Sequence, residues 1–70
     1  MKAFTIQKYT GDSNNRKLRV EEVKFTFEEA LEVFNEWVSD SNINEEDVTI
    51  RKEDNIAYTS IFNDTLITII

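Results

Sequence analysis

The chain has no cysteine, no histidine and no proline, and Gly11 is its only glycine. Without cysteine it can form no disulfide and offers no thiolate as nucleophile or metal ligand. Without histidine it also lacks the commonest general base and the commonest transition-metal ligand. A single glycine does not make a glycine-rich phosphate-binding loop. These absences argue against an enzyme, and we expect no catalytic residue, no cofactor and no metal.

One polar loop deserves a separate check because it carries oxygen side chains at alternate positions. Asp40, Asn42 and Asn44 stand where a calcium-binding loop has its first, third and fifth ligands. The sixth position, which needs glycine for a sharp turn, is Glu45. The twelfth, which needs a bidentate glutamate, is Arg51. The pattern therefore favours a polar connection after a helix over a specific calcium site.

Long apolar runs are also missing. No segment approaches the roughly 20 apolar residues of a membrane span, and the first residues alternate between polar and apolar instead of forming a signal peptide. We expect no membrane partner and a cytoplasmic protein. Seventy residues, of which 40% are apolar, suffice for one domain, and we expect a single α+β domain over residues 1–70.

The strongest local signal is a helix over about residues 26–40. Thr26 is a good N-cap, and Glu29 completes the capping box T-x-x-E. Apolar residues then recur at helical spacing from Ala30 to Val38. Alternating patterns predict strands over residues 3–9, 17–25, 48–52, 56–62 and 65–70. The predicted order is ββαβββ, an antiparallel-rich sheet with one helix packed across one face.

Three details of the strands are predicted as well. The apolar parity of residues 17–25 changes midway, which predicts a β-bulge or a bend near Glu21 and Glu22. Asn63 and Asp64 both tolerate positive φ and predict a two-residue turn between the last two strands. The last strand is so apolar that we expect it inside the sheet or in an interface, because an exposed edge of this kind would aggregate.

Charge is distributed unevenly. Residues 21–47 hold ten acidic residues and one base, Lys24, within a chain of net charge −6. At 100° per residue, Glu28, Glu32 and Glu36 lie opposite the apolar stripe of the helix, with Glu29 and Asp40 beside them. Like charges at i,i+4 destabilise a helix by about 0.2 to 0.5 kcal/mol per pair. The pattern fits either a binding surface for a basic partner or a surface that serves solubility.

Four of the eight basic residues of the chain gather around the first predicted hairpin: Lys8, Arg16, Lys17 and Arg19. The net charge of the chain would repel DNA, so we do not expect a nucleic-acid partner; pairing with the acidic region, within or between molecules, is the simpler role. Our functional hypothesis is a non-enzymatic interaction protein that binds a basic protein through the acidic helix face. A phage or mobile-element inhibitor of a DNA-handling enzyme is one form of it. The alternative is a structural protein that self-associates as a homodimer, through a sheet edge or the C-terminal strand.

Overall fold

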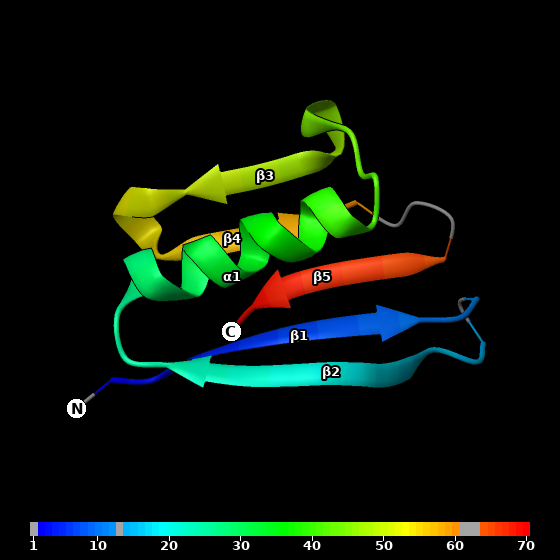
Figure 1. Ribbon diagram of the computed structural model, residues 1–70, viewed down its shortest axis with the longest axis horizontal. Helices are drawn as coiled ribbons and strands as arrows, with labels where there is room; N and C mark the ends of the chain where they lie inside the picture. The colour runs from blue at the N-terminus through cyan, green and yellow to red at the C-terminus, as the bar shows by residue number, and fades with distance from the viewer. Residues whose placement is uncertain (1, 13, 61–63) are drawn as a thin grey trace.

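A computed structural model describes residues 2–12, 14–60 and 64–70. The elements follow one another as β1 (Phe4–Thr10), β2 (Lys17–Lys24), α1 (Phe27–Asp40), β3 (Val48–Arg51), β4 (Ile56–Thr59) and β5 (Thr65–Ile69) (Figure 1). Two short 3₁₀ turns, η1 (Glu45–Asp47) and η2 (Lys52–Asp54), flank β3. The predicted α+β fold of order ββαβββ, with one helix, is confirmed.

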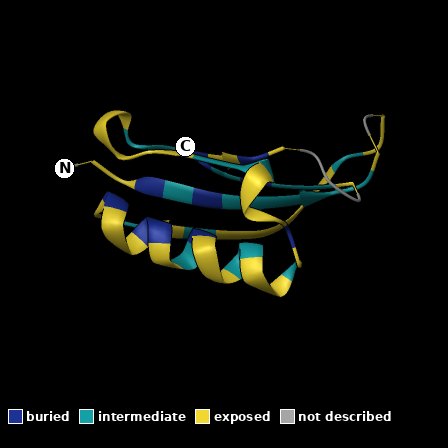
Figure 2. Cartoon of the chain, turned by 90° about the horizontal axis from the view of Figure 1, so that it is seen from above, coloured by how far each residue is buried: buried dark blue, intermediate teal, exposed yellow. Residues whose placement is uncertain are grey.

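The five strands form one antiparallel sheet in the order β2-β1-β5-β4-β3. The last strand lies at the centre, as its apolar sequence led us to expect, and β2 and β3 form the two edges. Helix α1 lies on one side of the sheet, and no helix of the described residues lies across the opposite side (Figure 2). The contacts of α1 with the sheet are chiefly with β5, β1 and β2. The helix therefore covers the middle and one flank of the sheet and leaves β3 beside it.

The core lies between α1 and the central strands. Phe34 of the helix and Ile6 and Ile67 of the sheet are fully buried. The ring of Phe27, at the start of α1, meets the ring of Phe4 edge-on, with 5.8 Å between centroids. Ile43, in the connection after α1, is also buried. The remaining core residues are Ala30, Leu31, Ala57 and Ile69.

The helix begins where its capping signal predicts. The Thr26 hydroxyl accepts a hydrogen bond from the Glu29 N–H at 3.2 Å and donates one to the Glu29 carboxylate at 2.9 Å. The Thr26 hydroxyl thus makes both hydrogen bonds of the pair, one as acceptor and one as donor, which is a variant of the capping box. A first-turn N–H that would lack an intrahelical partner is satisfied in this way.

The irregularity of β2 is not where parity predicted it. Lys8 pairs with Val20 but Tyr9 pairs with Leu18, so Arg19 is the extra residue, and Glu21 and Glu22 pair regularly with Gln7 and Ile6. The predicted bulge at Glu21 and Glu22 is therefore wrong in position. The prediction assumed that the apolar residues of this strand share one buried face, whereas β2 is an edge strand whose apolar side chains stay exposed.

Strand β4 ends at Thr59, which is 1% exposed. The register pairs Ala57 with Ile69 and Tyr58 with Thr68. At the next position, the Thr59 hydroxyl accepts a hydrogen bond from the Ile67 N–H at 3.0 Å. The strand predicted for residues 56–62 ends at Thr59; its residues 61 and 62, and Asn63 of the predicted turn, lie outside the described residues. Asp64 has φ 61°.

Candidate interaction surfaces

The predicted acidic residues lie on the solvent side of α1. Glu28, Glu29, Glu32, Glu36 and Asp40 are all exposed. Among the described residues, the ion pairs are Lys24 with Glu22 at 3.4 Å and Arg51 with Asp54 at 3.6 Å, and neither involves these five carboxylates. Their charge is thus directed to solvent and is not neutralised by a lysine or arginine of the same helix.

Helical spacing divides these carboxylates into groups. Glu28 and Glu32 stand on the flank of α1 that faces β3, where they line a hollow with Phe27 and Leu31. At 100° per residue, Glu36 projects furthest from the sheet. By the same geometry, Glu29 and Asp40 turn toward the β2 flank. We call the five carboxylates together the acidic ridge. On the β3 side, Glu28 and Glu32 of this ridge border a hollow of the surface.

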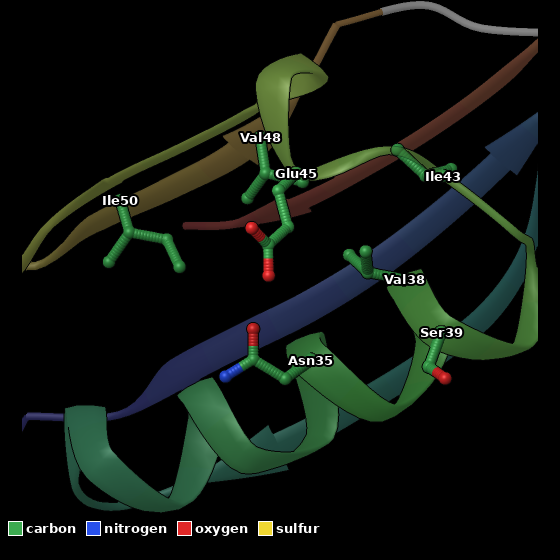
Figure 3. A pocket seen from close by; sticks show the side chains of 7 residues that line it. All are labelled: Asn35, Val38, Ser39, Ile43, Glu45, Val48 and Ile50. Carbon is green, nitrogen blue, oxygen red and sulfur yellow. The ribbon is translucent and has the colours of Figure 1, made fainter.

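Two adjoining hollows, which share Asn35, run between α1 and the β3 edge; we call them together the α1–β3 groove. The larger, of about 740 Å³, lies beside the C-terminal half of the helix and is lined by Asn35, Val38, Ser39, Ile43, Glu45, Val48 and Ile50 (Figure 3). The smaller, of about 360 Å³, lies at the N-terminal half and is lined by Phe27, Glu28, Leu31, Glu32, Asn35, Lys52 and Asn55.

The groove exists because one helix is too narrow to cover five strands. Val48 and Ile50 alternate to the α1 side of β3, paired with Thr59 and Ala57. The helix lies chiefly over the other half of the sheet, so Ile50 remains 37% exposed. Glu45 of η1 and Asn35 of α1 point into the groove from opposite banks (Figure 3). The result is an apolar floor with polar rims, open to solvent.

Most of the groove could not be identified from sequence. Glu28 and Glu32 were candidate binding residues, and Val38 belonged to the apolar stripe of the helix. Ile43, Val48 and Ile50 reach the same surface only because β3 lies at the sheet edge next to α1. The one local signal is Ile43, an isolated apolar residue in a polar connection, which is 8% exposed.

The basic residues of the first hairpin form no ion pair with the helix acids in the described part of the chain. Arg19 donates a hydrogen bond from Nε to the Thr10 hydroxyl at 2.6 Å. None of the salt bridges in the described part of the chain joins Lys8, Arg16, Lys17 or Arg19 to an acid of α1. Within the molecule, the pairing of the basic cluster with the acidic region is therefore not formed as an ion pair.

The side of the sheet away from α1 is a second exposed surface. Strand register places seven large apolar side chains there, and we call this surface the open sheet face: Tyr9, Leu18, Val23, Ile56, Tyr58, Leu66 and Ile70. Val23 is 48% exposed and Ile70 is 67% exposed. Large apolar side chains gathered on one face are a feature of interaction sites.

The described surface thus offers two candidates for recognition, the α1–β3 groove with its acidic ridge and the open sheet face. The only α-helix of the described residues, α1, is neither long nor apolar enough to cross a membrane. Comparison of the chain with protein-family models, with curated proteins and with solved structures found no match.

Proposed function

We propose that this chain is a non-enzymatic interaction module that binds a basic, amphipathic segment of a partner protein along α1, in the α1–β3 groove. The observation that carries the proposal is the combination of an apolar floor with carboxylates on both banks: Glu28 and Glu32 from α1, and Glu45 from η1. Lysine or arginine side chains of the partner would meet these carboxylates, and its apolar side chains would occupy the floor.

The charge of the site supports a basic partner. Glu28, Glu32 and Glu36 repeat at i,i+4, an arrangement that costs the helix stability and is not offset by lysine at neighbouring positions. Lys52 is the single cation among the residues that line the groove. An acidic site of this kind attracts basic segments over long range and repels acidic ones, which gives both association rate and selectivity.

The apolar floor supports a partner that inserts side chains as well as charges. Val38, Val48 and Ile50 offer apolar surface that the chain itself leaves partly uncovered, with the buried Ile43 behind them. Helix α1 has 14 residues and so runs for roughly 21 Å. An extended segment of about six or seven residues spans that length at 3.3 Å per residue. The site therefore suits a short linear segment in which basic and apolar residues alternate.

A purely solubilising role accounts for acidic side chains on a helix, but it makes no use of the groove beside them. The two interpretations differ in what a change of two glutamates does. If the charge serves solubility, the position of the removed charges does not matter. If the groove binds a basic segment, removal of Glu28 and Glu32 matters more than removal of equal charge elsewhere.

The test is a selection of random peptides displayed on phage against the immobilised chain at low ionic strength. We expect enriched sequences to combine lysine or arginine with apolar residues. Their affinity should fall steeply with salt, because exposed charges are screened beyond about 8 Å at physiological ionic strength. A selected peptide should bind the Glu28→Gln/Glu32→Gln variant at least about 10-fold more weakly, the loss of roughly 1.4 kcal/mol.

The matched control is Glu46→Gln/Glu53→Gln, which changes the net charge by the same amount at exposed positions outside the groove lining. This control should retain most of the affinity. Equal losses in the two variants would show that only net charge matters and would leave solubility as the reason for the acids. Enrichment of peptides without basic residues would also contradict the proposal.

The finer hypothesis, that the partner is a DNA-handling enzyme whose phosphate-binding groove is covered, is a proposal from charge and size. It predicts that double-stranded DNA displaces the chain from such a partner. Simultaneous binding of DNA and of this chain to the partner would contradict it.

A further inference from the structure

We propose that the open sheet face is the interface of a homodimer, in which two copies of the chain pack sheet against sheet with both α1 helices on the outside. This inference does not depend on the α1–β3 groove. It rests on the composition, the charge and the size of the face.

The face carries more large apolar side chains than a solvated sheet surface, among polar residues that include Thr5, Gln7, Thr49 and Thr68. Antiparallel sheets with one solvated side alternate between apolar residues inside and polar residues outside. In this protein, six large apolar side chains of three segments point away from α1. They are Leu18 and Val23 of β2, Ile56 and Tyr58 of β4, and Leu66 and Ile70 of the C-terminal segment. Strands β2 and β4 thus each contribute two large apolar side chains to this side. Tyr9 of β1 lies there as well, between Leu18 and Leu66.

The bulge of β2 contributes to this arrangement. Without the extra residue Arg19, Leu18 would share the side of Val20, under α1. With it, Leu18 pairs with Tyr9 and comes to the same side as Val23. Leu18 and Val20 are almost equally exposed, at 46% and 45%, but they stand on opposite sides of the sheet.

The charge of the face permits a second copy to approach. Among the described strand residues that point away from α1, Glu21 and Arg51 are the charged ones, one acid and one base. The carboxylates of α1 lie on the opposite side of the sheet. Two chains of net charge −6 can thus meet through a neutral face, while contact through the helix side brings like charges together.

Glu21 and Arg51 also stand on the two edge strands, β2 and β3. A two-fold axis parallel to the strands would lay β2 of one copy across β3 of the other. Each Glu21 then faces the strand of the second copy that carries Arg51. This isologous arrangement is closed and repeats each contact twice, as in most homodimers.

The size of the molecule sets an upper limit for the area of the face. The two longer extents are 34 and 23 Å, and the sheet lies across them (Figure 1). A rectangle of these dimensions, which the face does not exceed, is close to the roughly 800 Å² that each partner buries in a complex of standard size. Two sheets packed in this way stand about 10 Å apart, as in β-sandwiches. A 70-residue chain buries a smaller fraction of its surface by folding alone than a larger domain does, and the dimer would bury more of it.

The test measures the oligomeric state by sedimentation equilibrium of the wild-type chain and of two matched variants. The wild-type chain should be a dimer that persists at about 1 M NaCl, where the Debye length is about 3 Å. Leu18→Lys should raise the dimer dissociation constant by roughly 30-fold or more, the effect of losing an interface hot spot. Val20→Lys, the same change at equal exposure on the α1 side, should leave it unchanged.

Lysine brings the net charge of each chain closer to zero, so a loss of dimer in Leu18→Lys cannot come from added repulsion between copies. Tyr58→Ser, at the middle of the face, gives an independent variant without a new charge and should also dissociate the dimer. Near-ultraviolet circular dichroism should show that both variants keep the packing of the wild-type core. The melting temperature should rise with concentration for the wild-type chain and not for the variants.

A chain that is monomeric at all accessible concentrations would overturn the proposal. A dimer that survives Leu18→Lys and Tyr58→Ser would overturn it as well and would indicate pairing through a sheet edge. Lysine at Ile67 or Ile69 is not a suitable probe, because both side chains lie under α1 and would disrupt the core instead. Neither outcome affects the α1–β3 groove, so the two proposals fail or stand separately.

Discussion

The two sides of the sheet are made of alternate residues of the same strands, yet they have different roles in stability. Ile69 points toward α1 and is 5% exposed, whereas its neighbour Ile70 points away and is 67% exposed. The side under the helix holds the core, and the open sheet face holds apolar residues that the single chain does not bury. The difference teaches that an apolar side chain in or next to a strand of this protein does not by itself belong to the core, because the side of the sheet on which it lies decides whether α1 covers it.

The largest effect should separate Ile69 from Ile70. Ile69→Ala removes buried methyl groups from the core and should lower the free energy of unfolding by about 2 to 5 kcal/mol. Ile70→Ala should change it by less than about 0.5 kcal/mol in the monomer. Urea unfolding at low protein concentration, where a dimer would dissociate, measures both. Similar losses at the two positions would show that the open sheet face contributes to folding.

The next effect compares two threonines. Thr59→Val keeps the shape of the side chain but removes the acceptor of the Ile67 N–H and should cost about 1 to 3 kcal/mol. Thr68→Val, on the side away from α1, should be close to neutral. Urea unfolding gives the free energies, and hydrogen exchange should show faster exchange of the Ile67 amide in Thr59→Val alone. Unchanged exchange there would contradict the role assigned to the hydroxyl.

A smaller effect concerns the helix that makes the two sides different. Thr26→Ala removes the N-cap of α1 and should cost about 1 kcal/mol. Ser39→Ala, an exposed position in the last turn, should be neutral or stabilising because alanine has the higher helix propensity. Thermal unfolding followed by circular dichroism compares them. A Thr26→Ala variant as stable as the wild-type chain would mean that packing alone sets the start of the helix.

The smallest effect should come from the acidic ridge. Glu28→Gln/Glu32→Gln/Glu36→Gln removes two repulsive i,i+4 pairs, each worth about 0.2 to 0.5 kcal/mol. It also removes the favourable interaction of Glu28 with the helix N-terminus. We expect a net gain of at most a few tenths of a kcal/mol in low salt that vanishes in high salt. Unfolding of this variant would show that the glutamates do not face solvent.

The helix and the element order follow from local patterns. Thr26 and Glu29 identify the start of α1, and the apolar spacing from Ala30 onward identifies the face that it buries. Alternation identifies the strands, and the apolar last strand correctly indicated a place inside the sheet. Parity placed the irregularity of β2 near Glu21 and Glu22 instead of at Arg19. The parity argument assumes that all apolar residues of a strand point to the buried side, and in β2 they point to both sides and remain exposed.

The sequence by itself determined the fold class, the start and buried face of α1, and the exposed position of Glu28, Glu32 and Glu36. These features depend on residues within a few positions of one another, whose geometry the backbone period sets. Only the tertiary structure decided which surfaces those residues share. The order β2-β1-β5-β4-β3 places Val48 and Ile50 beside α1 and gathers Leu18, Tyr58 and Ile70 on one side. Such neighbours are distant in sequence, and strand order depends on packing and register over the whole sheet.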